Sequence, residues 1–91
     1  MLISRRSDII CREVDGKLVG LDLRSSQYFS LNPTGTLLWR LLEQGTEPNS
    51  LVDALVTSHH LSPELAATQV DAFLESLRKQ ELIEEEPQPP G

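Results

Sequence analysis

One stretch decides the fold of this 91-residue chain: Leu21-Asp-Leu-Arg-Ser-Ser-Gln-Tyr-Phe-Ser-Leu-Asn-Pro-Thr-Gly-Thr-Leu-Leu-Trp-Arg-Leu-Leu-Glu-Gln-Gly45. It reads as the end of one strand, a turn, a second strand and a capped helix. Asn32-Pro33 marks the helix start, because an Asn side chain caps free backbone N–H groups and Pro fits the first helical position. Leucines from Leu38 to Leu42 follow with helical spacing, and Gly45 is predicted to stop the helix.

The segments before this stretch predict an antiparallel sheet. The segment 8–14 is short, and it mixes branched apolar side chains with charged ones, as in an edge strand. Asp15-Gly16 follows, the dipeptide that two-residue hairpin turns prefer. Lys17 to Leu23 alternates in polarity, and Gln27 to Leu31 makes a third strand. Because the turns are short, the three strands should pair in chain order.

Two more helices are predicted downstream. Ser50 with Asp53 resembles a capping box and opens a helix to about His59. Ser62-Pro63-Glu64 starts a third helix, whose apolar stripe is Ala66, Val70, Phe73, Leu74 and Leu77. The predicted class is therefore α+β: a three-stranded antiparallel sheet followed by three helices, in a winged helix-turn-helix-like arrangement.

We expect one domain over residues 1–83, in which Leu82 and Ile83 return to the core. Residues 84–91 are acidic and Pro-rich, and they are predicted to form a disordered tail. A chain of this length buries a modest core and cannot enclose a large pocket, which favours a binding module over an enzyme.

The charge balance argues against nucleic acid as a partner. Eight Lys and Arg face 14 Asp and Glu, for a formal net charge of −6. An acidic surface repels phosphate backbones. The third helix carries only Arg78 and Lys79 as basic groups, near its end, so DNA binding by a winged helix is a weak alternative.

No set of residues predicts catalysis, a metal or a cofactor. Cys11 is the single cysteine, which excludes an intramolecular disulfide and a cysteine-rich metal site. His59 and His60 are adjacent, and neighbours on a helix point about 100° apart. No window reaches about 18 apolar residues, and the N-terminus does not read as a signal peptide, so we expect a cytoplasmic protein without membrane contact.

The third predicted strand is the candidate binding site. In a three-stranded meander the first and third strands are edges, and charges on the first discourage pairing with another chain. The third strand has no charge and can accept a peptide as an extra strand. Two other readings stay open: a helix or the C-terminal segment covers this edge, or a second copy pairs with it. The candidate residues are Gln27, Tyr28, Phe29, Ser30 and Leu31.

The third helix would provide the other wall of a peptide groove. Its apolar stripe has two flanks on a helical wheel, one near Asp71 and Arg78 and one near Gln69 and Ser76. We expect the first flank to face the peptide. The candidate residues there are Ala67, Val70, Asp71 and Leu74.

The pattern Leu21-Asp-Leu…Tyr28-Phe-Ser-Leu-Asn-Pro-Thr-Gly…Leu38-Trp-Arg-Leu-Leu…Gly45 resembles the PqqD-like family of peptide-recognition elements. These elements serve pathways that make ribosomal, modified peptides. The resemblance continues through Ser62-Pro63-Glu64, residues 70–74 and Leu82-Ile83. Within the family the chain looks most like the stand-alone leader-binding proteins of lasso peptide biosynthesis.

The resemblance implies a function without catalysis. The leader of a precursor peptide would pair antiparallel with residues 27–31 and lie against the third helix. The protein would then present the precursor to a cysteine protease and an ATP-dependent macrolactam synthetase. The alternative within the family is a precursor chaperone for a radical enzyme in pyrroloquinoline quinone synthesis.

Overall fold

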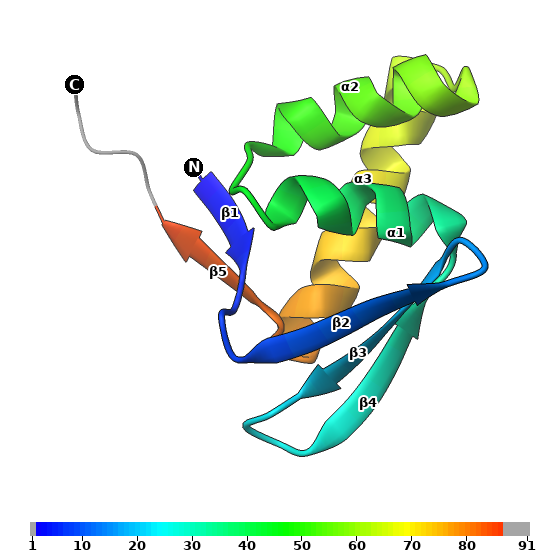
Figure 1. Cartoon of the computed structure of the whole chain (residues 1–91). Helices are drawn as coiled ribbons and strands as arrows, with labels where there is room; N and C mark the ends of the chain where they lie inside the picture. The colour runs from blue at the N-terminus through cyan, green and yellow to red at the C-terminus, as the bar shows by residue number, and fades with distance from the viewer. Residues whose placement is uncertain (1, 87–91) are drawn as a thin grey trace.

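The computed structural model describes residues 2–86 as two small sheets and three helices (Figure 1). The strands and helices follow in the order β1 (Leu2–Arg5), β2 (Ile9–Val14), β3 (Lys17–Asp22), β4 (Gln27–Leu31), α1 (Pro33–Leu42), α2 (Pro48–His59), α3 (Pro63–Lys79) and β5 (Ile83–Glu86).

The three-stranded sheet has the order β2-β3-β4, antiparallel throughout, as predicted. The β2–β3 turn is a two-residue loop in which Asp15 and Gly16 have φ of 53° and 79°, as a primed hairpin turn requires. The register aligns Ile10, Leu21 and Tyr28 in one row across the sheet. This confirms the predicted α+β class and meander.

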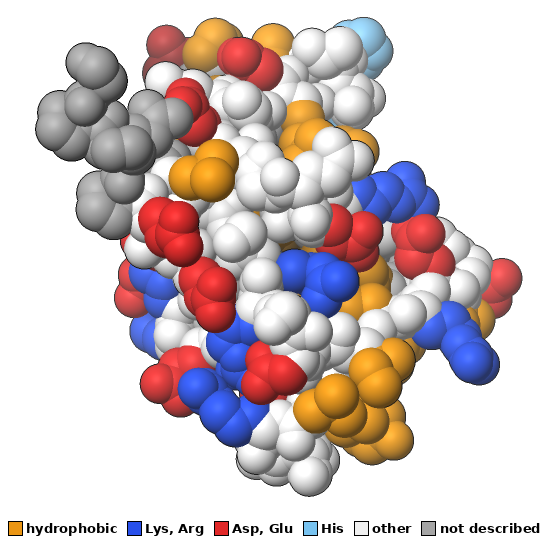
Figure 2. All heavy atoms as spheres, turned by 60° about the vertical axis from the view of Figure 1, so that its left-hand side comes forward, with side chains coloured by type: hydrophobic (Ala, Val, Ile, Leu, Met, Phe, Trp, Pro, Cys, Tyr) orange, Lys and Arg blue, Asp and Glu red, His pale blue; other side chains and the backbone are white. Residues whose placement is uncertain are grey.

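The predicted apolar alternation of β3 belongs largely to the outer face of the sheet. Leu18, Gly20 and Asp22 are buried, whereas Val19 is 40% exposed. Ile10 on β2 and Tyr28 on β4 lie on the same outer face and are 59% and 75% exposed. Figure 2 shows hydrophobic side chains gathered low on the molecule, at the level of this sheet, with charged side chains mixed over the rest of that view.

A second sheet was not predicted. It pairs β1 with β5 antiparallel, with Leu2 opposite Glu86 and Arg5 opposite Ile83. The predicted disordered tail is therefore wrong for residues 84–86, which form β5 because β1 supplies a strand to pair with. Residues 87–91 lie outside the described part of the chain.

The helices pack as their sequences predict. Asn32 Oδ1 accepts the N–H of Gly35 at 2.8 Å, and Ser62 Oγ accepts that of Leu65 at 3.2 Å, so the predicted caps of α1 and α3 are confirmed. Helix α2 begins at Pro48, with Pro in the first turn, so Ser50 lies inside the helix and the predicted capping box is wrong. The core is one apolar cluster that includes Trp39, Leu51, Leu55, Val70, Leu74, Leu77 and Leu82.

One contact fixes β4 on this core. The Phe29 ring lies across β3 and meets Trp39, with ring centroids 5.4 Å apart. It has this space because residue 20 is a glycine: a Cβ there would lie 2.2 Å from Phe29 Cζ. Trp39 is fully buried, so the Phe29 side chain attaches the middle of β4 to the centre of the molecule, while Leu31 packs against the same core at the end of the strand.

We therefore expect Gly20→Ala to destabilise the fold, because the methyl group would force the Phe29 ring out of its place. Overpacking of this kind costs about 1–3 kcal/mol, measurable as a lower midpoint of urea unfolding. The control is Gly20→Ala made in the Phe29→Leu variant, where the added methyl group meets no ring. There it should lower the free energy of unfolding by less. An equal loss in both backgrounds would refute this account of Gly20.

Candidate functional site: the open edge of β4 and the groove beside α3

Strand β4 is an open edge of the three-stranded sheet. Among residues 2–86, its sheet partner is β3 alone, because β5 pairs with β1 on another side of the molecule. The strand sequence Gln-Tyr-Phe-Ser-Leu carries no charge. The expectation of an uncovered edge is thus met within the described residues.

The register shows which backbone groups of β4 are free. Residues that flank a two-residue hairpin loop form a hydrogen-bonded pair, and such pairs then alternate along the ladder. Counting from Val14 and Lys17, the backbone of Gly20 points toward β4 and pairs with Phe29. The N–H and C=O groups of Tyr28 and Ser30 therefore point away from the sheet.

A side-chain bridge supports this assignment. Leu18 donates its N–H to Thr36 Oγ1 at 3.0 Å, and Thr36 Oγ1 donates in turn to the Leu31 carbonyl oxygen at 3.4 Å. The backbone of Leu18 thus faces the β4 side, as the alternation requires. Thr36 belongs to α1 and is buried, so the helix helps to hold the end of β4 in place.

A groove runs beside β4 and consists of two hollows between β4 and α3. The first hollow, of about 560 Å³, lies at the Leu31 end of β4. It contains no charged residue. The residues that line it are Ser30, Leu31, Asn32, Thr34, Gly35, Leu38, Gln69, Ala72, Phe73 and Ser76.

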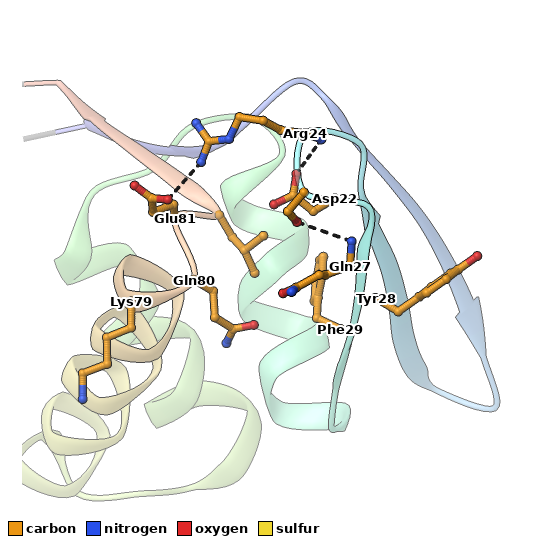
Figure 3. A pocket seen from close by; sticks show the side chains of 10 residues that line it. Asp22, Arg24, Gln27, Tyr28, Phe29, Lys79, Gln80 and Glu81 are labelled. Atoms are coloured by element: carbon orange, nitrogen blue, oxygen red, sulfur yellow. Dashed lines mark hydrogen bonds and ion pairs between the residues drawn. The ribbon is translucent and has the colours of Figure 1, made fainter.

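The second hollow, of about 380 Å³, lies at the Gln27 end of β4 and the C-terminal end of α3. Figure 3 shows Gln80 reaching toward Gln27 and Phe29 across it, while Glu81 turns to Arg24 and Tyr28 points away. Arg24 and Glu81 form an ion pair at 3.2 Å. This end of the groove is therefore charged, whereas the other end has no charged residue.

The candidate residues on β4 line this groove. Gln27, Tyr28 and Phe29 border the second hollow, and Ser30 and Leu31 border the first. They lie in one continuous strand whose backbone is free at two positions. The structure thus brings together the five strand residues that the sequence suggested.

The candidate residues on α3 do not line the groove. Val70 and Leu74 are 1% and 2% exposed, inside the core. Ala67 and Asp71 lie on the flank that leads to Arg78, and Arg78 forms an ion pair with Glu85 of β5. None of Ala67, Asp71 and Arg78 borders either hollow, so the placement of a peptide on this flank stays a prediction that the two hollows do not favour.

The opposite flank of α3 borders the groove through Gln69, Ala72, Phe73 and Ser76. The sequence indicates both flanks of the helix but does not distinguish them, because the strand β5 was not predicted. Phe73 belongs to the predicted apolar stripe, and in the structure it is half-buried and lies at the groove.

A buried ion pair lies under the Gln27 end of the groove. Arg6 and Asp22 are 6% and 5% exposed, and Arg6 Nη2 lies 2.7 Å from Asp22 Oδ1. The Arg6 guanidinium, together with the backbone N–H of Arg24, holds the pKa of the Asp22 carboxyl well below its usual range. The carboxylate is thus charged at neutral pH and directs the turn from β3 into β4.

Chemistry beyond binding has little support in the described residues. Burial raises the pKa of the Cys11 thiol, so it is not an activated nucleophile. Residues 2–86 contain no group of three His, Cys, Asp or Glu that could hold a metal ion. In the same part of the chain, no helix combines the length and hydropathy needed to cross a membrane.

Together, the fold and groove define an α+β domain of winged-helix type with one open sheet edge beside a helix. The model of the family described as coenzyme PQQ synthesis protein D (PqqD) matches residues 17–83, so the chain belongs to the PqqD family. The resemblance drawn from the segment Leu21–Gly45 is thereby confirmed. A search of curated proteins found no match.

Two solved structures resemble this chain over nearly its whole length. One is TbiB1 in complex with the TbiA(beta) leader peptide, 27% identical, with a TM-score of 0.84 over 93% of this chain and 99% of that chain. Another is lasso peptide synthetase B1 complexed with the leader peptide, 25% identical, with a TM-score of 0.80 over 91% and 98% of the two chains.

The lowered pKa of Asp22 predicts how stability depends on pH. A carboxyl whose pKa is lower in the folded state stabilises the fold above its unfolded pKa of about 3.9, and this contribution is lost as the pH falls toward the folded pKa. Asp22→Asn should therefore be less stable than the wild type at neutral pH, and the difference should narrow below about pH 4.

The measurement is the urea midpoint of both proteins over a range of pH. Asp53→Asn is the control, because Asp53 is exposed on α2 and takes no part in the Arg6 network. Its curve should run parallel to that of the wild type. A constant difference between Asp22→Asn and the wild type at every pH would contradict the assignment of Asp22.

Proposed function

We propose that this chain binds the leader segment of a ribosomally made precursor peptide as an extra strand on β4 and is not itself an enzyme. The observation that carries the proposal is the uncharged, open edge of β4 with a groove beside it. The two similar solved structures, both bound to leader peptides, support it.

The free backbone groups define how such a peptide would sit. An antiparallel segment would exchange hydrogen bonds with Tyr28 and with Ser30, which lie two residues apart. Side chains opposite these two would point to the outer face of the sheet. Side chains opposite Leu31, Phe29 and Gln27 would point into the groove, so the groove would read every second residue of the leader.

The two ends of the groove favour different side chains. The leader residue opposite Leu31 would enter the uncharged hollow beside Phe73, which suits an apolar group. The residue opposite Gln27, four positions later in an antiparallel segment, would meet the polar hollow beside Gln80. The groove therefore favours a leader with an apolar residue followed, four positions on, by a hydrogen-bonding one.

The energies suit a reversible complex. Each backbone hydrogen bond contributes about 0.5–1.5 kcal/mol, and each buried apolar anchor about 1.5–3 kcal/mol. Ordering a flexible segment costs about 2–5 kcal/mol or more. For four hydrogen bonds and two anchors the balance is at most about 10 kcal/mol, so the Kd is no tighter than about 50 nM, which allows capture and release.

The bound precursor would be handed to separate enzymes. The likeness to lasso peptide proteins favours a leader peptidase of the cysteine protease class and an ATP-dependent macrolactam synthetase as partners. Holding the leader raises the effective concentration of the rest of the precursor at such an enzyme. A role for the same edge in pyrroloquinoline quinone synthesis is the second candidate, favoured by the family match over residues 17–83.

The first test is an NMR titration with a synthetic leader, taken from the small open reading frame nearest the gene. Amide shifts should concentrate in residues 27–31 and at Gln69, Phe73 and Ser76. Light scattering in parallel excludes pairing of two copies through the same edge. Shifts confined to α2, or a dimer that the peptide does not dissociate, would refute the proposal.

Tyr28→Pro should weaken leader binding about tenfold, because it removes one outward-pointing donor. The β3–β4 ladder should survive, since the Tyr28 N–H points away from β3. Isothermal titration measures the affinity, and circular dichroism confirms the fold.

Two controls distinguish the effect of the Tyr28 N–H from that of its side chain and from a change of surface charge. Tyr28→Ala keeps the N–H and should bind more tightly than Tyr28→Pro. Asp71→Lys changes the charge on the flank of α3 that faces away from β4, so its affinity should equal that of the wild type. If Asp71→Lys lost as much affinity as Tyr28→Pro, the peptide would lie against the Asp71 flank of α3, and its placement beside Phe73 would be contradicted.

A further inference from the structure

Different contacts set the width of the groove at its two ends. At the Leu31 end, α1 touches both walls: a Cβ on Gly35 would lie 3.3 Å from Leu31 Cβ and 3.3 Å from Phe73 Cε1. Close apolar packing sets the width there. At the Gln27 end, the walls are the start of β4 and the segment after α3, and a charged side chain joins them.

That side chain is Arg6, in the connection between β1 and β2. Its Nη1 donates to Asp22 Oδ2 at 3.3 Å and to the Glu81 carbonyl oxygen at 2.6 Å. Asp22 lies opposite Gln27 in the β3–β4 register, and Glu81 follows Gln80 of the other wall. One guanidinium therefore spans from the base of β4 to the end of α3.

All three side-chain nitrogens of Arg6 contact acceptors. Nη2 faces Asp22 Oδ1 at 2.7 Å and Asp8 Oδ1 at 2.9 Å, and Nε donates to Asp8 at 3.0 Å. A guanidinium holds its N–H donors in a rigid fork, and here each of its three nitrogens donates to at least one acceptor. The Arg24–Glu81 ion pair crosses the same gap but is exposed, so it constrains the gap weakly.

We infer that Arg6 is a positioning residue for the bound peptide: it sets the width of the groove at the Gln27 end. This inference rests on the proposed leader binding. Without the fork, Glu81 and Gln80 lose their fixed distance from Asp22 and Gln27. The C-terminal part of the bound leader then lacks a formed second wall, while its N-terminal part still meets Phe73 and Gly35.

The test compares two peptides on two variants. The peptides are the synthetic leader described above and the same leader shortened so that it ends opposite Phe29. Arg6→Lys keeps the charge but loses the fork. Arg6→Met with Asp22→Leu removes the ion pair and replaces it with apolar groups, an exchange that buried pairs often tolerate without loss of stability. Urea unfolding checks that both variants fold.

The wild type should bind the full leader about tenfold more tightly than the shortened one, because one backbone pair and one side chain are added. In both variants this ratio should fall to about threefold, because the backbone pair with Tyr28 remains and only the contact with the second wall is lost, and the shortened leader should bind as tightly as it does to the wild type. If Arg6 only stabilised the fold, its variants would lose affinity for both peptides by the same factor, and the ratio would stay unchanged. Arg40→Lys, which alters the Arg40–Glu13 ion pair elsewhere on the surface, should keep the wild-type ratio.

The outcomes separate the two proposals. An unchanged ratio in both variants, or equal binding of the two peptides by the wild type, overturns the role of Arg6 and leaves leader binding intact. Absence of shifts in residues 27–31 of the wild type with either peptide overturns leader binding, and the role of Arg6 with it.

Discussion

The contact of Phe29 with Trp39 across Gly20 is the constraint on which the rest of the structure depends. An edge strand has hydrogen bonds on one side only, so it needs side chains to hold it against the core. In β4 the ring of Phe29 does this alone at the centre, because Tyr28 and Ser30 point outward. The edge can therefore stay open without the strand detaching, and an open edge is what a partner strand requires.

From this centre the groove extends in two directions, and different interactions form its two ends. Toward Leu31 it is formed by apolar contacts among α1, α3 and β4, which are short-ranged and insensitive to pH. Toward Gln27 it is formed by a buried ion pair and a carbonyl contact, which are directional and require a charged Asp22. A single groove thus combines a permanently packed end with an end whose geometry depends on one salt bridge.

The sequence predicted the parts of the fold that have local signals. Asp15-Gly16, Asn32-Pro33 and Ser62-Pro63 each mark a turn or cap whose chemistry requires those residues, and the meander and the open edge follow from them. The pairing of β1 with β5 had no such signal, because it joins segments from the two ends of the chain and β5 is mostly glutamate. Without β5, the two flanks of α3 are equivalent in the sequence, and the prediction favours the flank of Asp71 over that of Gln69 and Ser76. The contacts of Arg6 had no local signal either, because its partners Asp22 and Glu81 are distant in sequence.

The β1–β5 sheet also decides how this domain can be attached to other chains. Leu2 and Glu86 lie directly opposite each other in the pairing of β1 with β5, and Figure 1 shows these two strands at the side of the molecule away from β4. A tether joined at either of these points would leave from the side remote from the open edge. An affinity tag, a surface linker or a fused enzyme could therefore be placed at one end, or at both, with the groove still facing solution. Immobilisation through these points should accordingly preserve the orientation in which β4 meets its ligand.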